Sequence, residues 1–224
     1  TERDLKPRQG AIFMKLKTAL FDFDGVLVDT EPIYDIFWNE AGERYGTGID
    51  NFAAVIKGTT LPYIIEKYFS DRTEEFRQMI IKESTEYEST MPLPAMPGSL
   101  EFLHLLKKNG VQMGLVTSSD NTKVERAFKL HHLENMFDTI VTADRITKGK
   151  PDPMCYLLAA DDLHVSPADC LVFEDSFAGI QAGTAAGMRV IGLSTTNPEE
   201  SLKDKVYEVI PNFEKVTFED YQKW

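Results

Sequence analysis

The sequence predicts an α/β fold in which a mostly parallel sheet core carries an inserted, all-helical second unit. From residue 99 onward, short apolar runs alternate with helical patterns, as in successive βαβ units. Residues 33–90 carry helical patterns alone, and the proline-rich run 91–98 follows them as a stiff link. We therefore expect two units: a core made of residues 16–31 and 98–224, and a helical cap made of residues 32–97.

The first strand is predicted from the apolar stretch Ile12–Phe23, which runs into Asp24-Gly25, a pair typical of a tight loop. Pro32 suits the first turn of the helix that follows, and apolar residues recur at helical spacing as far as Tyr45. The same reasoning predicts further helices in the cap, at residues 51–56, 62–69 and 73–88.

The rest of the chain alternates between helices and strands. Helices are expected at the amphipathic or glycine-terminated segments 100–108, 122–130, 153–163 and 177–186. Strands are expected at the short apolar runs 111–117, 139–142, 170–173, 189–193 and 206–210. Gly179 and Gly183 share one helix face and would let that helix pack closely on the sheet, with Gly187 at its end.

Composition limits the partners and the compartment. The 224 residues carry a net charge of −12, which argues against non-specific binding to nucleic acid or to an anionic membrane. An acidic surface still permits an anionic substrate, because local cations can hold a phosphate group. Cys155 and Cys170 lack metal-type spacing, and residues 1–17 lack the apolar core of a signal peptide. We therefore expect a cytoplasmic monomer that acts on a small molecule, with no nucleic-acid or membrane partner.

Two carboxylates lie two residues apart at the end of the first predicted strand. Strand residues i and i+2 point to the same side, so Asp22 and Asp24 would lie side by side. Open α/β sheets bind their ligands at this end of their strands. Neighbouring carboxylates repel each other unless they share a cation or a proton. The pair therefore indicates a metal site or an acid–nucleophile pair; for an isolated Asp-x-Asp, a simple Asx-turn would be the alternative.

Other polar side chains follow later strands or precede a helix. Thr117-Ser118-Ser119 ends one strand, Glu174-Asp175 ends another, and Lys150 precedes a helix. Taken singly, these residues suit a turn, a solvated lysine or a helix cap. Together at one sheet edge they favour phosphoryl transfer, because carboxylates and phosphate oxygens ligate Mg²⁺. Lysine and hydroxyl donors would offset the charge of the transferred group.

Four motifs, in this order, resemble those of the haloacid dehalogenase superfamily, in the helical-cap subgroup that includes β-phosphoglucomutase and many small-metabolite phosphatases. The first motif, Asp-x-Asp-Gly-x-x-x-Asp-Thr, matches residues 22–30 in full. The second is an apolar strand ending in Thr117-Ser118, the third is Lys150-Pro151, and the fourth is Glu174-Asp175-Ser176. The resemblance spans nearly the whole chain and implies a Rossmann-like core with a helical cap.

The resemblance implies roles for five residues of the first three motifs. Asp22 would be the nucleophile and a Mg²⁺ ligand. Asp24 would be the general acid/base and would ligate the metal through its carbonyl oxygen. Thr117, Ser118 and Lys150 would bind the phosphoryl group, and Lys150 would also offset its charge.

The fourth motif would complete the metal site. By the same resemblance, Asp175 would hold Mg²⁺ and Glu174 would ligate it directly or through water. Lys148 competes with Lys150 for the third motif, but Lys150 directly precedes the proline. We therefore expect a Mg²⁺-dependent phosphatase that cleaves a small phosphorylated metabolite, foremost a sugar phosphate, through an aspartyl-phosphate intermediate.

A phosphomutase of the β-phosphoglucomutase type is the alternative. The resemblance implies three positions that hold a His, an Arg and a Lys in those enzymes, and here they hold Tyr34, Leu61 and Asp120. The loss of these groups favours transfer to water, whereas other lysines could supply a cation: Lys57, Lys67 and Lys123.

Three other classes fit the sequence less well. A haloacid dehalogenase needs neither Mg²⁺ nor a second acid, yet Asp24 is present. A phosphonate hydrolase would need a cap lysine for a Schiff base, for which Lys57 is a candidate. A receiver-type signalling domain has no use for an acid/base at Asp24 or for an inserted cap.

Overall fold

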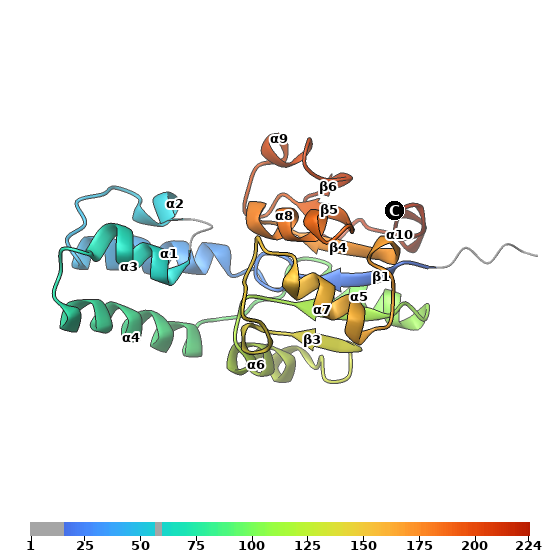
Figure 1. The fold of residues 1–224 in the computed structure, drawn as a ribbon, viewed down its shortest axis with the longest axis horizontal. Coiled ribbons are helices and arrows are strands. Elements are labelled where there is room, and N and C mark those ends of the chain that lie inside the picture. Colours follow the sequence, from blue (N-terminus) through green and yellow to red (C-terminus); the bar gives the residue numbers. More distant parts are fainter. Residues whose placement is uncertain (1–15, 57–59) are drawn as a thin grey trace, which may run out of the picture.

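The computed structural model describes residues 16–56 and 60–224, and these residues form a six-stranded sheet flanked by helices, with a helical block at one end (Figure 1). All neighbouring strands are parallel, in the order β3-β2-β1-β4-β5-β6. The strands are β1 (Thr18–Phe21), β2 (Met113–Val116), β3 (Thr139–Val141), β4 (Cys170–Glu174), β5 (Arg189–Leu193) and β6 (Glu208–Ile210). The predicted α/β class is confirmed.

The strand order places a topological switch beside β1. The chain builds the sheet outward through β2 and β3, then crosses to β4 and continues outward on the other side. Phe21 at the end of β1 pairs with Leu115 of β2 and with Phe173 of β4. The carboxyl ends of β1 and β4 are therefore neighbours at the position where such sheets bind their ligands.

Helices cover both faces of the sheet. The strand side chains alternate between two apolar clusters: Ala19 and Phe21 face one, and Leu20 faces the other. One cluster is completed by α5 (Ser99–Lys108), α6 (Asn121–His131) and α10 (Phe218–Lys223). The other is completed by α7 (Met154–Asp162), α8 (Phe177–Ala185) and α9 (Glu199–Leu202). Two short 3₁₀ turns, η1 (Ala143–Arg145) and η2 (Pro167–Asp169), lie in the connections.

Four helices form the block beyond the carboxyl edge of the sheet (Figure 1). They are α1 (Glu31–Arg44), α2 (Phe52–Ile56), α3 (Leu61–Phe69) and α4 (Glu74–Thr90). The hydroxyls of Thr60 and Thr73 cap α3 and α4 by accepting backbone N–H bonds. The block buries a separate apolar cluster around Phe52 and Phe69, so its helices pack mainly on one another.

Two connections join the helical block to the sheet core, and they pair with each other. The Asp29 N–H donates to Pro94 O at 2.8 Å, and the Met96 N–H donates to Leu27 O at 2.8 Å. An antiparallel bridge joins Val28 to Ala95 between these bonds. Movement of the block relative to the core would therefore have to act on both connections together.

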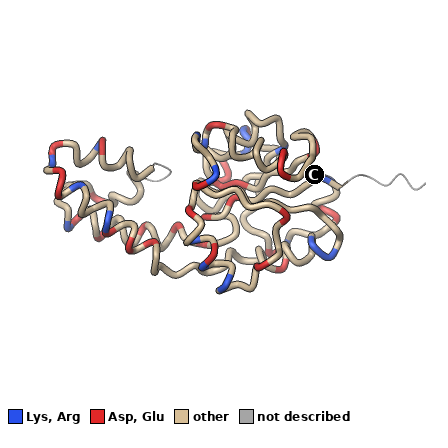
Figure 2. Tube along the Cα trace, turned by 60° about the horizontal axis from the view of Figure 1, so that its bottom comes forward, with Lys and Arg blue, Asp and Glu red and all other residues tan. Residues whose placement is uncertain are grey.

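The predicted elements correspond to observed ones, with ends that differ by a few residues. β1 begins at Thr18, and the predicted strand residues 12–15 lie outside the described part of the chain. Lys57 also lies outside it. The short helices α9 and α10 were not predicted. None of the described helices combines the length and apolar character needed to cross a membrane. Acidic positions are spread over core and block, with basic positions scattered among them (Figure 2).

Candidate active site

The site is centred on Asp22, the first residue after β1. Its N–H donates to Phe173 O of the neighbouring strand β4 at 3.1 Å, which fixes the backbone at the sheet edge. Lys150 places its ammonium between two carboxylates, with Nζ 2.7 Å from Asp22 Oδ1 and 2.6 Å from Glu174 Oε1. The Lys150 side chain is only 8% exposed, whereas that of Lys148 is 71% exposed and lies 4.0 Å from Asp152. The structure thus places Lys150, and not Lys148, among the carboxylates.

Three carboxylates converge at this point. Oxygens of Asp22, Glu174 and Asp175 all lie within 4.8 Å of one another. Burial, followed by repulsion from Glu174, raises the pKa of Asp22 to about 7. Burial and repulsion from Asp22 and Glu174 also raise the pKa of Asp175 well above its usual value. Lys150 offsets only part of this repulsion, so a divalent cation with oxygen ligands fits the cluster.

Asp175 is held by the loops around it. The Thr196 hydroxyl donates to Asp175 Oδ2, and the Asn197 amide donates to Asp175 O at 3.0 Å. Gly25, with φ of +75°, lies so close that a Cβ there would overlap the Asp175 carboxylate. Glycine at this position therefore serves both the left-handed turn and the close approach of the acid.

Glu174 is fully buried and hydrogen-bonded on both oxygens. Oε1 accepts from Lys150 and from the Tyr156 hydroxyl, the latter at 2.8 Å. Oε2 accepts from the N–H and the hydroxyl of Ser176, both at distances of 3.2–3.3 Å. A Cβ on Gly179 would overlap this carboxylate, so α8 packs directly over it. These contacts hold Glu174 in one orientation beneath Asp22 and Lys150.

Asp24 has a different environment from Asp22. Oδ1 accepts from the Thr30 hydroxyl at 2.6 Å and from Lys123 Nζ at 2.7 Å, and Oδ2 accepts from the Ser119 hydroxyl at 2.8 Å. Burial would raise the pKa of Asp24, but the Lys123 ammonium and these donors lower it below its usual value. Different neighbours thus shift the pKa values of the two acids of the first motif in opposite directions.

The loop after β2 brings hydroxyls to the same edge. Thr117 is buried and its N–H donates to Val141 O at 2.9 Å, while its hydroxyl accepts from the Ser119 N–H at 3.0 Å. Ser118 is exposed and lines the cavity. Asp120 accepts from the Lys123 N–H at 2.9 Å and so caps the start of α6. Asp120 also lines the cavity.

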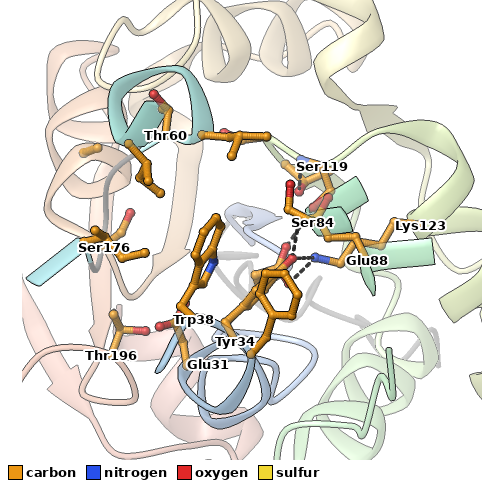
Figure 3. Close-up of a pocket in the computed structure, with 18 of the residues that line it drawn as sticks. Glu31, Tyr34, Trp38, Thr60, Ser84, Glu88, Ser119, Lys123, Ser176 and Thr196 are labelled. Atoms are coloured by element: carbon orange, nitrogen blue, oxygen red, sulfur yellow. Dashed lines mark hydrogen bonds and ion pairs between the residues drawn. The ribbon is translucent and has the colours of Figure 1, made fainter. Parts of the chain in front are cut away.

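A cavity of about 540 Å³ lies between these groups and the helical block. Its floor is the sheet edge with Asp22, Asp24 and Lys150. Its far wall is mostly apolar and comes from α1 to α4, with these aromatic and aliphatic side chains: Phe37, Trp38, Ile56, Leu61, Ile64 and Tyr87. Figure 3 shows Trp38 and Tyr34, both from α1, among the residues that line this cavity. The volume suits a small metabolite.

Comparison with known proteins now places the chain in a family. The family model described as haloacid dehalogenase-like hydrolase matches residues 19–193. The chain belongs to the haloacid dehalogenase-like hydrolases. Hexitol phosphatase A of Escherichia coli is 32% identical over 209 residues, which cover 91% of this chain and 94% of that protein.

Solved structures of haloacid dehalogenase-like proteins share the fold. A hydrolase of this family from Entamoeba histolytica superposes with a TM-score of 0.81 at 28% identity, covering 93% of this chain and 98% of that one. β-Phosphoglucomutase from Clostridium difficile superposes with a TM-score of 0.75 at 26% identity, covering 93% and 96%. Phosphatases and phosphomutases therefore both occur among the similar proteins.

Two residues at the site, Thr196 and Tyr156, have no role predicted from the sequence, and Lys123 is predicted there only as a candidate cation for a mutase. Thr196 follows strand β5, so the strand-tip reasoning that singled out Asp22 would have found it. Ser119 belongs to the predicted run of hydroxyls after the second strand, and the structure adds its hydrogen bond to Asp24. Lys123 and Tyr156 project from helices, and their distance from Asp24 and Glu174 depends on how those helices pack. The sequence alone therefore does not predict that these two side chains reach the carboxylates.

Proposed function

We propose that the protein is a Mg²⁺-dependent phosphatase that hydrolyses a small sugar phosphate through a phosphorylated Asp22. The observation that carries the proposal is the triangle of Asp22, Lys150 and Glu174, with Asp24 held separately beside it. A buried lysine beside a carboxylate nucleophile gives a site for phosphoryl oxygens, and a second acid serves proton transfer. Family membership and the similarity to hexitol phosphatase A support the proposal.

The metal would be held by residues of the first and fourth motifs. Asp22 and Asp175 would supply carboxylate oxygens, and Glu174 would ligate directly or through water, since oxygens of these three residues lie within 4.8 Å of one another. Asp24 would add its backbone carbonyl, as the resemblance to the family implies. When bound, Mg²⁺ would neutralise the charge shared by the carboxylates and the phosphoryl group. The carboxylate repulsion described above is the feature of this chain that fits such an ion.

The reaction has two chemical steps, in which Asp22 forms and breaks the bond to phosphorus and Asp24 transfers protons. Asp22 attacks phosphorus and forms an acyl-phosphate bond, while the bond to the leaving alkoxide breaks and Asp24 gives that oxygen its proton. Asp24 then takes a proton from water, which attacks the phosphorus and frees Asp22 and inorganic phosphate. Lys150, Thr117 and Ser118 would hold the phosphoryl oxygens in both steps.

The cavity supports a compact, polyhydroxylated leaving group. Aromatic side chains such as Trp38 offer flat faces for a sugar or hexitol, and the hydroxyl-bearing residues Thr60 and Ser84 line the same cavity (Figure 3). The helices α1 to α4 would then act as a cap over residues 16–31 and 98–224. The two free cysteines, both buried, suit a cytoplasmic enzyme, which we propose to act as a monomer.

Phosphate release from a panel of hexose and hexitol phosphates tests this function. We expect turnover with Mg²⁺ and its loss after exhaustive EDTA treatment. Lys150→Met should lower turnover about 10²-fold or more, the scale of one lost electrostatic donor. Lys148→Met is the matched control and should retain wild-type turnover, since Lys148 is exposed. Undiminished activity in EDTA, or equal losses in the two variants, would contradict the proposal.

A phosphomutase is the second candidate, and Lys123 is the observation in its favour. Of the lysines named as replacements for the missing mutase cation, Lys123 lines the cavity. Lys67 instead donates to the Tyr63 hydroxyl at 2.8 Å on the exposed side of α3. However, Lys123 is already paired with Asp24. Asp120 adds a carboxylate at the cavity, which disfavours a second phosphate.

A further inference from the structure

Lys123 links the proposed acid/base to the helical block. It lies in the first turn of α6, on the sheet core, and its side chain is 6% exposed. Its ammonium lies 2.7 Å from Asp24 Oδ1 and 2.6 Å from the Tyr34 hydroxyl of α1. A lysine ammonium has three donors, so it can serve both partners at once.

The chain of bonds continues into the last helix of the block. The Tyr34 hydroxyl donates to Glu88 Oε1 of α4 at 2.6 Å and accepts from Lys123, so it acts as both a donor and an acceptor. Figure 3 shows Lys123, Tyr34 and Glu88 joined in this way at the edge of the cavity. Because α1 and α4 lead into the two connections, the contact joins α6 to both ends of the block at once.

A second residue of α6 strengthens this junction. Arg126, three residues after Lys123, donates to Met91 O at 2.6 Å and to Glu88 O at 2.8 Å. Positions three apart lie on the same helix face, so Lys123 and Arg126 present one surface to the end of α4. The helix α6 is therefore one element of the core that holds the block, through hydrogen bonds from two of its side chains.

We propose that Lys123 is a positioning residue that couples the placement of the helical block to the orientation of Asp24. This rests on the proposed function, since it assigns the acid/base role to Asp24. Of the donors on the Asp24 carboxylate, Thr30 precedes α1 and Lys123 is bonded to Tyr34 of α1. When α1 and α4 move away from α6, Lys123 loses Tyr34, and Asp24 loses the link to the block that runs through Lys123.

The kinetic test uses two phosphate esters that differ in their need for an acid. Tyr34→Phe removes the hydroxyl without changing any charge, and Lys123→Met removes the ammonium. We expect Tyr34→Phe to lower kcat for an alkyl phosphate about 3- to 10-fold, the scale of one hydrogen bond. We expect Lys123→Met to lower it about 10²-fold, and both variants to affect nitrophenyl phosphate less. Lys123→Arg should recover part of the loss, and the exposed Lys129→Met is the control.

The double variant decides whether the two residues act through one another. Tyr34→Phe should have no further effect in a protein that already carries Lys123→Met. Fully multiplicative losses, or equal losses with the alkyl and nitrophenyl esters, would overturn the coupling.

Amide hydrogen exchange measures the stability of the contact between α6 and the helical block without requiring turnover. We expect Tyr34→Phe and Lys123→Met to speed amide exchange in residues 30–36 and 85–91, and Lys129→Met to leave it unchanged. Unchanged exchange in the first two variants overturns the proposal, whatever the activity. If the wild type hydrolyses no phosphate ester, the proposed function fails, and the exchange data alone decide whether Lys123 ties the block to the core.

Discussion

At the scale of single residues, the structure separates two aspartates that the sequence presents as a pair. Asp22 lies against other carboxylates and its pKa is raised to about 7, whereas Lys123, Thr30 and Ser119 lower the pKa of Asp24. The difference comes from partners on distant parts of the chain. One motif therefore contains two carboxyl groups whose pKa values shift in opposite directions.

The raised pKa of Asp22 predicts how the metal-free protein responds to pH. Its value in the folded state is about 7, against an ordinary value of 3.8, so between these values the folded chain keeps a proton that the unfolded chain releases. Asp22 therefore lowers the free energy of unfolding as pH rises through this window, by roughly 1.4 kcal/mol per pKa unit at most.

Asp22→Asn tests this dependence in EDTA. The variant lacks the titrating group, so its melting temperature should exceed that of the wild type by an increasing margin from about pH 4 to pH 7. Thermal unfolding at several pH values measures the margin. A margin that stays constant or shrinks as pH rises would show that Asp22 is not held among repelling carboxylates.

The contacts of Asp24 predict a loss that depends on the leaving group. Asp24→Asn should slow hydrolysis of an alkyl phosphate roughly 10²- to 10⁴-fold, the usual contribution of general acid–base catalysis. The loss should be smaller for nitrophenyl phosphate, because nitrophenolate leaves without a proton. Steady-state rates on both esters check this, and equal losses would argue against the acid role.

At the scale of elements, the sequence predicts which residues follow strands better than which helix faces meet the site. Because parallel strands end at one edge, the sequence predicts that Asp22, Glu174 and Asp175 are neighbours, and the structure brings their oxygens together. Lys123 depends on the packing of α6 against α1, which no local pattern encodes. The helices α9 and α10 escaped prediction because they span four and six residues, too short for a helical period to be recognised.

The helix α8 gives a prediction about close packing. A Cβ at Gly179 would overlap the Glu174 carboxylate, whereas one at Gly183 would lie 3.0 Å from Val190 and 3.3 Å from Val172. Alanine should benefit both positions by its higher helix propensity. Gly179→Ala should nevertheless lower stability by about 1–3 kcal/mol through overpacking. It should also weaken the thermal stabilisation by Mg²⁺, because Glu174 must shift away from Lys150.

Gly183→Ala is the matched control on the same helix face. It should change the melting temperature little and keep the Mg²⁺ response, since small movements of valine side chains relieve its contacts. Thermal unfolding with and without Mg²⁺ compares the two variants. If they behave alike, α8 does not position Glu174 through its close approach at Gly179.

At the scale of the whole molecule, we expect the cavity between core and helical block to determine whether a phosphoryl group passes to water or to a sugar phosphate. A mutase must hold a sugar bisphosphate in two orientations, which needs a second phosphate site. Tyr34 and Asp120, at the positions where the resemblance implies a His and a Lys in the mutases, line the cavity, and neither is cationic. We therefore expect phosphate release from β-glucose 1-phosphate plus a bisphosphate activator to exceed formation of glucose 6-phosphate, as one coupled assay can measure. Isomerisation much faster than release would establish the mutase instead, with Lys123 as the first residue to examine.

The central claim is that Asp22 carries the phosphoryl group, and rapid quenching during turnover tests it most directly. The wild type, mixed with Mg²⁺ and excess sugar phosphate, is quenched in acid and digested, and the phosphorylated peptide is located by mass spectrometry. We predict an acid-stable, base-labile phosphate on Asp22, present during turnover and absent from Asp22→Asn. Phosphate on another residue, or rapid turnover by Asp22→Asn, would contradict the account.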